Sequence, residues 1–335
     1  MPDPMAQIRQ IIEAGNHFLV ASHTNPDGDA MGSQVAMGHV LATLGKDFRL
    51  YSASGLPDHF AWLDLPGPVY SSLESLEPFV PDWYIVLDCG DPFRIGKELM
   101  QAVTPSKIIN IDHHVGNPHF GAAAWVDPRH AAVGEMVALL AKNFGIPLTG
   151  GLGQAVYLAL VADTGHFAYG NTRPETLELA AEIVRLGLDP GQFTAMYQNQ
   201  WTVSRMRLWS VALGQTRLFC KAKVAVLQVS AEVMEGTGTT SFDCEGLVEF
   251  IRRIRGVRVA MLLREDGPRR IKFSLRSHGD DDVQRVALEF GGGGHRNASA
   301  GFVIDTMDAA QTVLLGAISR VLGLVDDDCP ESARA

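Results

Sequence analysis

The chain has 335 residues, of which 46% are hydrophobic and 20% are charged, and its formal net charge is −10. This composition is typical of a globular protein with about two domains and excludes a disordered or fibrous chain. Four widely spaced cysteines exclude a disulfide-rich scaffold, and the acidic net charge argues against a general duplex-DNA binder. The sequence has neither a long apolar run nor a signal-peptide pattern, so we expect a cytoplasmic protein with no membrane partner.

Strand and helix patterns alternate through the first part of the chain. Helices are predicted over 6–14, 30–44, 133–144, 154–162 and 174–186, and strands over 17–22, 48–51, 84–87 and 107–111. Asn171 or Thr172 is placed to cap the helix that begins at Pro174. This alternation predicts an α/β fold with a mainly parallel, doubly wound sheet. We place this domain over residues 1–190 and a helical linker over 191–215.

The pattern changes after the linker. Strands are predicted over 224–229, 257–263 and 270–276, and helices over 245–254, 283–290 and 307–321. They predict a smaller α+β domain over residues 216–325, followed by a frayed polar tail over 326–335. Between 252 and 276 the chain has nine Lys or Arg residues and two Asp or Glu residues, which is a local excess of positive charge.

Four apolar segments of the first domain each end in acidic residues, and histidines accompany several of them. In chain order, these residues are His23, Asp27 and Asp29, then Asp88, then Asp112, His113 and His114, and finally Asp163. Ligand sites in open parallel sheets lie beyond the carboxyl ends of the strands, so we expect these side chains to converge. Asp27 and Asp29 alone are equally well explained as turn or helix-cap residues, but four such segments are not.

A cluster of carboxylates without basic partners is unfavourable unless cations neutralise it. Two divalent cations balance the charge of Asp27, Asp29, Asp88 and Asp163. Oxygen-rich ligands with histidine and no cysteine favour Mn²⁺, Mg²⁺ or Fe²⁺. Two neighbouring ions of this kind activate water and neutralise a phosphoryl group, so the residues predict hydrolysis of a phosphate ester.

The second domain contains a candidate anion site. The glycine run 291–294 exposes successive backbone N–H groups, a common arrangement for holding an anion. Side-chain donors follow the run, and Arg276 on a predicted strand is suited to a bidentate phosphate contact. The alternative is a flexible surface loop. The candidate substrate-binding residues are Arg276, Gly292, Gly293, Gly294, His295 and Arg296.

Together, these motifs resemble those of the DHH phosphoesterase superfamily with its DHH-associated C-terminal domain. The matching residues are His23, Pro26, Asp27, Gly28 and Asp29, then Asp88, Asp112, His113, His114 and Asp163, and the glycine run with His295. Length and spacing are similar to the short two-domain members, the NrnA-type oligoribonucleases (nanoRNases) that also dephosphorylate 3′-phosphoadenosine 5′-phosphate. The small-residue run 298–301 is one residue longer than the usual pattern.

The resemblance implies a centre with two divalent cations, with Mn²⁺ favoured over Mg²⁺ and Fe²⁺. The implied ligands are His23, Asp27 and Asp88 for one cation, and Asp29, Asp88, His113 and Asp163 for the other, with Asp88 bridging. His114 would face the scissile phosphate, and Asp112 would orient a ligand imidazole. We therefore take His114, Asp88 and Asp112 as candidate catalytic residues.

The resemblance also implies an activity. We expect hydrolysis of short single-stranded RNA or dinucleotides to 5′-mononucleotides, together with conversion of 3′-phosphoadenosine 5′-phosphate to AMP. The alternatives among hydrolases are a RecJ-like single-strand exonuclease and a phosphodiesterase for linear or cyclic dinucleotides. A non-catalytic nucleotide-binding regulator is the alternative outside that class. Stable duplex DNA is not an expected partner, and the oligomeric state stays open, a homodimer included.

Overall fold

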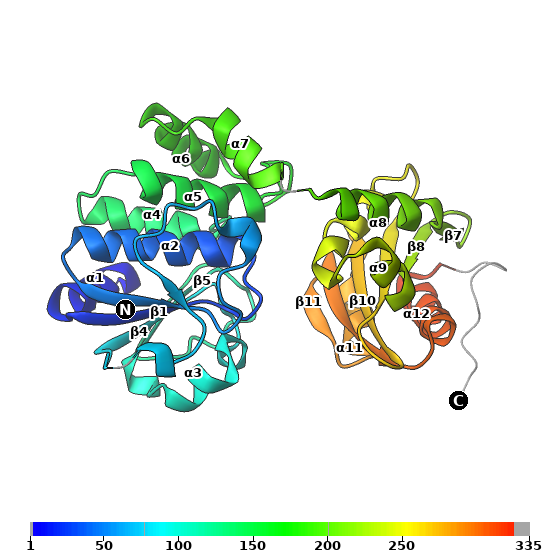
Figure 1. Cartoon of the computed structure of the whole chain (residues 1–335), viewed down its shortest axis with the longest axis horizontal. Coiled ribbons are helices and arrows are strands. Elements are labelled where there is room, and N and C mark those ends of the chain that lie inside the picture. Colours follow the sequence, from blue (N-terminus) through cyan, green and yellow to red (C-terminus); the bar gives the residue numbers. More distant parts are fainter. Residues whose placement is uncertain (1–2, 77, 200, 325–335) are drawn as a thin grey trace. The chain divides into compact units, whose positions relative to one another are not determined.

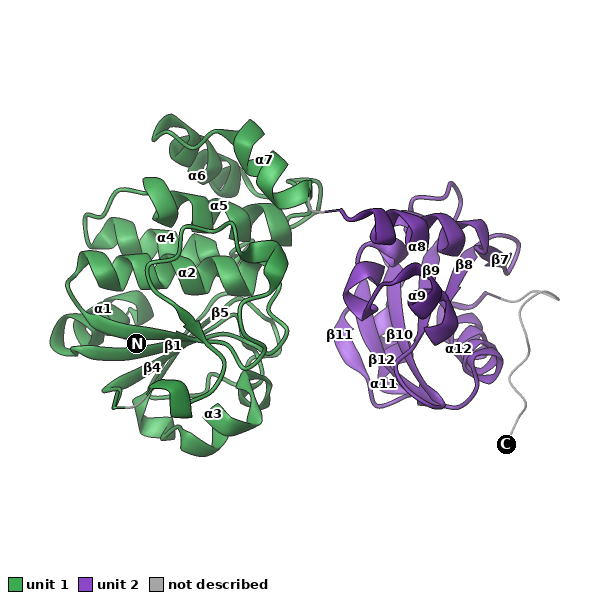
Figure 2. Ribbon diagram, in the orientation of Figure 1, with its two compact units in different colours: residues 1–200 green, residues 201–335 purple. Residues whose placement is uncertain are grey.

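The computed structural model describes residues 3–76, 78–199 and 201–324, in two compact units over 1–200 and 201–335 (Figures 1 and 2). The tail predicted over 326–335 lies outside the described residues. The structure divides the stretch predicted as a linker, because α7 (Pro190–Gln198) belongs to the first unit and α8 (Val203–Gly214) to the second. None of the helices in the described ranges combines the length and apolar character that crossing a membrane requires.

A six-stranded parallel sheet forms the centre of the first unit. Its strands are β1 (His17–Ala21), β2 (Asp47–Tyr51), β3 (Val69–Tyr70), β4 (Trp83–Leu87), β5 (Ile108–Asp112) and β6 (Ala123–Val126). They lie in the order β3-β2-β1-β4-β5-β6, so the direction of strand succession reverses at β1 and β4. In sheets of this kind, ligands bind beyond the carboxyl ends of the strands at the reversal.

Helices cover both faces of this sheet (Figure 1). One side carries α1 (Pro4–Ala14), α2 (Gly28–Thr43), α4 (Val133–Asn143), α5 (Gly150–Asp163), α6 (Pro174–Arg185) and α7, and the other carries α3 (Lys97–Ala102). On the first side, α1, α2 and α4 contact the strands, α5 packs on α2 and α4, and α6 and α7 pack on α5. Alternate strand residues face the two cores: Phe18 and Val20 pack with α2, α4 and α5, whereas Leu19 packs on the α3 side. Gly32 permits close contact of α2 with α5, because a Cβ there would lie 2.6 Å from the Ala155 carbonyl oxygen.

The second unit contains a mixed six-stranded sheet. In the order β11-β12-β10-β9-β8-β7, its strands are β11 (Gly293–His295), β12 (Ala298–Ile304), β10 (Arg270–Ser277), β9 (Val259–Glu265), β8 (Val224–Val229) and β7 (Arg217–Phe219). The neighbours β8 and β9 are parallel, and the other pairs are antiparallel. The helices are α8, α9 (Ala231–Thr237), α10 (Leu247–Arg252), α11 (Val283–Leu288) and α12 (Met307–Leu322). One core contains α11 and α12, and the other contains α8 and α10.

These observations confirm the predicted fold class, an α/β unit with a parallel sheet followed by a smaller α+β unit. One local prediction is wrong. Arg173 occupies the N-cap position of α6 without a side-chain cap. Asn171, predicted as a possible cap, instead donates hydrogen bonds to the carbonyl oxygens of Ala131 (3.2 Å) and Asp163 (3.0 Å).

The glycine run of the second unit is only partly a loop. Residues 293–295 form β11, which pairs with β12 as the edge of the sheet. Gly294 has φ +133°, and a Cβ there would lie 2.5 Å from the Ala298 carbonyl oxygen. Close backbone contact therefore accounts for this glycine. Gly291 and Gly292 therefore lie outside the strand, while Gly293 and Gly294 lie on the edge strand of the sheet.

Candidate metal centre

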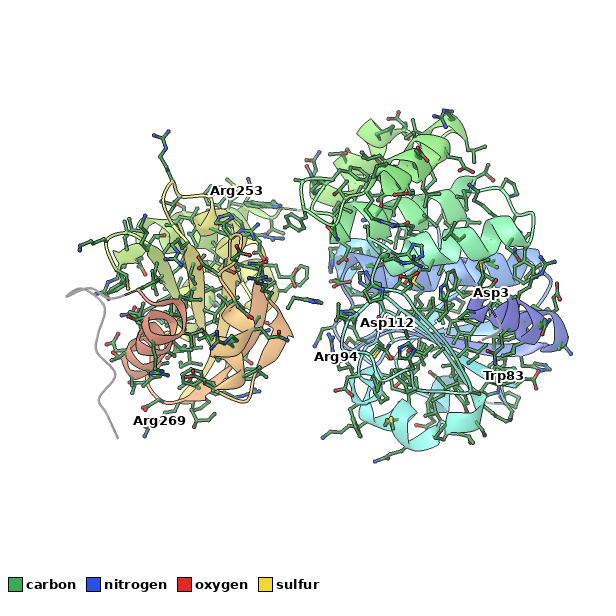
Figure 3. All side chains as sticks on the ribbon, turned by 180° about the vertical axis from the view of Figure 1, so that it is seen from behind. Asp3, Trp83, Arg94, Asp112, Arg253 and Arg269 are labelled. Atoms are coloured by element: carbon green, nitrogen blue, oxygen red, sulfur yellow. The ribbon has the colours of Figure 1, made fainter. Side chains whose placement is uncertain are left out.

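The acidic and histidine residues of the first unit lie where four segments end. β1 leads into His23 and Asp27, and Asp27 caps α2 by accepting hydrogen bonds from the backbone N–H of Asp29 (3.1 Å) and Ala30 (3.0 Å). Asp88 follows β4 directly with φ +51°, a left-handed conformation that Asp adopts more readily than most residues. Asp112 ends β5 (Figure 3) and Asp163 ends α5.

The structure brings these side chains together in three overlapping groups whose ligand atoms lie within 4.8 Å of one another. The groups are His23, Asp27 and Asp88; Asp29, His113 and Asp163; and Asp88, His113 and His114. Asp88 joins the first group to the third, and His113 joins the second to the third. The candidate ligands therefore form one continuous cluster at the end of the sheet where its strand order reverses.

Asp88 is the central carboxylate of this cluster. Its Oδ2 lies 3.6 Å from Nε2 of His23, and its Oδ1 lies 3.7 Å from both Nε2 of His113 and Nδ1 of His114. The side chain is 4% exposed, and within the described residues Oδ1 accepts no hydrogen bond. A buried carboxylate oxygen without a donor is costly, and a cation would satisfy it. The residues present therefore fit a divalent metal ion.

The electrostatics of the cluster favour a cation as well. Burial raises the pKa of Asp88 well above its usual value, and the neighbouring carboxylates Asp29 and Asp27 raise it further. Burial likewise raises the pKa of Asp163, to about 6. The pKa of Asp27 is lowered to about 2, because its hydrogen bonds and the charge of His23 outweigh its burial. Ionising all the carboxylates together thus requires positive charge beyond that of the histidines.

Asp29 and His113 are held from behind by one segment of the chain. Both oxygens of Asp29 accept backbone hydrogen bonds at the start of α4, from Val133 (2.7 Å) and Gly134 (3.0 Å). His113 Nδ1 lies 3.1 Å from the carbonyl oxygen of His130, and its Nε2 lies 3.8 Å from Asp29 Oδ2. These contacts fix which ring nitrogen of His113 faces the carboxylates.

The side chain of Asp112 holds His114, whereas the family resemblance implies that it orients a ligand imidazole. Its Oδ1 accepts a hydrogen bond from His114 Nδ1 (2.8 Å), and its Oδ2 accepts one from Asn117 Nδ2 (2.6 Å). Asp112 thus holds the imidazole expected to face the phosphate, while a backbone carbonyl holds His113. Burial raises the pKa of Asp112, but the hydrogen bond and charge of His114 lower it to a net value below the usual one.

Several residues of the site carry no signal that sequence reasoning detects. Asn117 also donates to Oδ1 of Asn110 (2.7 Å), which lies on β5. Glu135 lies in the first turn of α4, an ordinary position for an acidic residue on a helix. The roles of these side chains depend on tertiary contacts, which no spacing in the sequence indicates.

The candidate substrate residues of the second unit lie around β11. Arg276 on β10 and His295 on β11 both pair with Ala298 of β12, so the two residues occupy one row across three strands, about 10 Å apart. Arg276 Nε donates to Glu249 Oε1 (2.7 Å). Arg296, in the turn after β11, donates to the carbonyl oxygen of Asp280 (2.8 Å). Arg276 and His295 are therefore brought to one face, while Arg296 is engaged in the turn.

A parallel sheet with a cluster of acidic and histidine residues at its strand ends is typical of metal-dependent hydrolases. Residues 17–180 match the N-terminal domain of the DHH family, and residues 221–321 match the DHHA1 domain. The chain belongs to the DHH phosphoesterase family. This confirms the family that the sequence motifs resemble.

Relatives align over nearly the whole chain. The bifunctional oligoribonuclease and PAP phosphatase NrnA of Thermus thermophilus is 33% identical over 97% of this chain and 93% of its own length. The protein of the same name from Bacillus subtilis is 28% identical over 89% of this chain and 92% of its own. The crystal structure of an exopolyphosphatase-related protein from Bacteroides fragilis superposes with a TM-score of 0.88 at 27% identity, covering 96% and 97% of the two chains.

Proposed function

We propose that this protein hydrolyses short oligoribonucleotides to 5′-mononucleotides and also converts 3′-phosphoadenosine 5′-phosphate to AMP. The observation that carries the chemistry is Asp88, whose two oxygens face different histidines at the centre of the cluster. The substrate class is supported by the Thermus thermophilus relative, whose name gives both activities. The alternatives are a RecJ-like exonuclease, a cyclic dinucleotide phosphodiesterase and a non-catalytic binder.

We infer that the cluster holds two divalent cations. Oxygen and imidazole ligands suit Mn²⁺, Mg²⁺ and Fe²⁺, and the family resemblance favours Mn²⁺ among them. One cation would be bound by His23, Asp27 and Asp88, and the other by Asp29, Asp88, His113 and Asp163. When bound, the cations supply Lewis-acid polarisation of the phosphoryl group and acidification of water. Asp112 fixes the tautomer and orientation of His114, which contacts the scissile phosphate in this proposal.

A substrate panel tests the proposal. With Mn²⁺ present, rates should be highest on dinucleotides to pentanucleotides of RNA and should fall as the strand lengthens, and 3′-phosphoadenosine 5′-phosphate should also be hydrolysed. The chain is acidic overall and has one short basic segment, 252–276, which suits a substrate with only a few phosphates. A highest rate on long single-stranded DNA would favour the RecJ-like alternative, and a highest rate on cyclic di-AMP the cyclic dinucleotide alternative. Binding without turnover on any substrate would favour the regulator.

In the second unit, we propose that Arg276, Gly292, Gly293, Gly294, His295 and Arg296 bind the substrate's terminal phosphate or nucleotide. Arg276 is the strongest candidate, because it shares a row with His295 on one face of the sheet. Its guanidinium is oriented by two hydrogen bonds, from Nε to Glu249 (2.7 Å) and from Nη1 to the carbonyl oxygen of Leu275 (3.0 Å). A charged hydrogen bond contributes about 1.5–3 kcal/mol, so Arg276→Met should raise KM by roughly 10- to 150-fold while kcat changes little.

Steady-state kinetics on the dinucleotide pApA measure this effect. Arg269→Met is the matched control, since Arg269 forms an exposed ion pair with Asp305 beside the same strand. Its KM should equal that of the wild type. An unchanged KM in Arg276→Met would remove this arginine from the substrate site.

A further inference from the structure

One short segment of the chain, residues 130–134, directly contacts two of the candidate ligands, Asp29 and His113. Its backbone N–H groups at Val133 and Gly134 bind both oxygens of Asp29. Its carbonyl at His130 faces Nδ1 of His113. We call residues 130–134 the backing segment, because it lies behind these ligands and supplies only main-chain groups to them.

The backing segment is also tied to the third ligand of the same group. Asn171 Nδ2 donates to the carbonyl oxygen of Ala131 (3.2 Å) and to that of Asp163 (3.0 Å). The group of Asp29, His113 and Asp163 therefore depends on the position of one stretch of backbone. A displacement of this stretch would move all three ligands relative to one another.

Glu135 holds the backing segment in place. Its Oε2 accepts hydrogen bonds from the backbone N–H of Ala131 (3.0 Å) and from Thr176 Oγ1 (3.2 Å). Its Oε1 lies 3.0 Å from His130 Nδ1 and accepts a hydrogen bond from Arg173 Nη2 (3.0 Å). The side chain is 4% exposed, so the carboxylate is buried and both of its oxygens are used.

Glu135 is charged as well as buried. Burial raises its pKa, but the hydrogen bonds from His130 and Ala131 and the charge of Arg173 lower it to a net value below the usual one. A neutral amide at this position would accept hydrogen bonds only through its oxygen, because its nitrogen is a donor. The substitution Glu135→Gln therefore loosens the backing segment while nearly preserving side-chain volume.

We propose that Glu135 is a positioning residue for the cation held by Asp29, His113 and Asp163, although it is not itself a ligand. This inference rests on the proposed two-cation centre. The ligands of the other group are held differently: Asp27 accepts from the start of α2, and His23 Nδ1 lies 2.9 Å from the carbonyl oxygen of Thr24. Loss of Glu135 should therefore weaken one cation site and spare the other.

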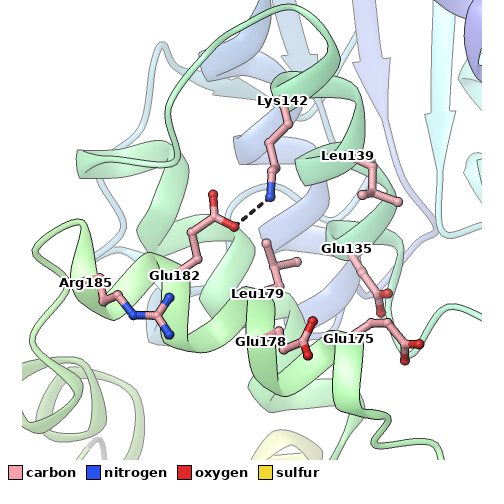
Figure 4. A pocket seen from close by; sticks show the side chains of 8 residues that line it. All are labelled: Glu135, Leu139, Lys142, Glu175, Glu178, Leu179, Glu182 and Arg185. Carbon is pink, nitrogen blue, oxygen red and sulfur yellow. Dashed lines mark hydrogen bonds and ion pairs between the residues drawn. The ribbon is translucent and has the colours of Figure 1, made fainter.

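The surroundings of Glu135 supply a matched control. It borders a surface cavity of about 540 Å³ between α4 and α6, which Glu182 and Lys142 also line (Figure 4). Glu182 Oε2 accepts a hydrogen bond from Lys142 Nζ (2.6 Å). Glu182→Gln makes the same chemical change in the same cavity and also weakens an ion pair. Its ion-pair partner is Lys142 on α4, which lies outside the backing segment.

The test is a Mn²⁺ titration of the metal-free full chain, in which electron paramagnetic resonance measures the concentration of free Mn²⁺ at each step. The wild type should bind two ions. In Glu135→Gln, one affinity should fall by about 10- to 100-fold, the usual effect of removing a group that supports a metal ligand, while the other stays within about twofold. Glu182→Gln should reproduce the wild-type isotherm.

Kinetics separate positioning from general structural damage. Excess Mn²⁺ should restore kcat of Glu135→Gln on pApA, with KM for pApA unchanged. If Glu135→Gln does not fold, Arg173→Gln carries the test, since it removes one donor to Glu135 and should weaken the same cation site by a smaller factor. Equal weakening of both sites, or an unchanged isotherm, would overturn the inference. The wild type could show no turnover while Glu135→Gln still weakened one Mn²⁺ site more than the other. That outcome would contradict the proposed function but not this inference.

Discussion

Replacing Asp88 by Asn should reduce kcat on pApA by about 10³-fold or more, as expected when a central group of a catalytic centre is lost. The two oxygens of Asp88 face different histidines, so an amide would leave one candidate cation site with a poor ligand. The same substitution should raise the melting temperature of the metal-free protein. It replaces a buried carboxyl group, whose pKa is raised by burial and by neighbouring carboxylates, with a group that carries no charge.

Opposite changes in activity and stability identify a functional carboxylate. Asp82→Asn is the matched control, because Asp82 precedes the same strand, β4, and accepts hydrogen bonds from the backbone N–H of Asn16 and His17. That variant should be less stable and fully active. Turnover within tenfold of the wild type in Asp88→Asn, with an unchanged response to Mn²⁺, would rule out Asp88 as the bridging ligand.

The difference in stability between the metal-loaded and metal-free protein should grow as pH rises from about 5 to 8. Asp29 and Asp88 have pKa values raised well above normal, chiefly by burial, and the pKa of Asp163 is raised to about 6 for the same reason. A carboxyl group with a raised pKa in the folded state stabilises the fold below its unfolded pKa. That stabilisation is lost as pH rises through the folded value.

Cations reverse this loss because they neutralise the carboxylates and compete with protons for them. At neutral pH, Mn²⁺ at 100 times the Kd of a site should stabilise the fold by about 2.7 kcal/mol for each site that it fills. Thermal unfolding in chelator and in Mn²⁺, at several pH values, measures this difference in stability. Titrating groups far from the cluster contribute equally to both measurements, so their contributions cancel. A difference that is independent of pH would contradict the raised pKa values.

The sequence predicts the long elements well and the short ones poorly. The helix expected over 30–44 is α2, and the strand expected over 84–87 is β4, because each has a clear apolar pattern. The strands β3 and β7 have two and three residues and form only by pairing with β2 and β8. β11 consists of two glycines and a histidine, so its strand conformation comes from the neighbouring β12 rather than from propensity.

The site divides in the same way. Its candidate ligands directly follow apolar segments, and the sequence alone indicates that placement. The supporting groups give no such signal, because they are ordinary residues at no characteristic spacing from the ligands, and some of them come from far along the chain. The Val133 N–H that binds Asp29, for example, is 104 residues away from it. Asn117 and Glu135 likewise become meaningful only through the side chains that they touch.

The candidate ligands come from the loop after β1, the ends of β4 and β5, and the end of α5, and in the described residues all three groups fall in the first unit. Partial unfolding that detaches any one of these segments must also break coordination. A bound cation therefore suppresses local opening of the first unit and makes these segments exchange their amide hydrogens as one cooperative block. The second unit, which contributes no residue to these groups, keeps its own opening free energy.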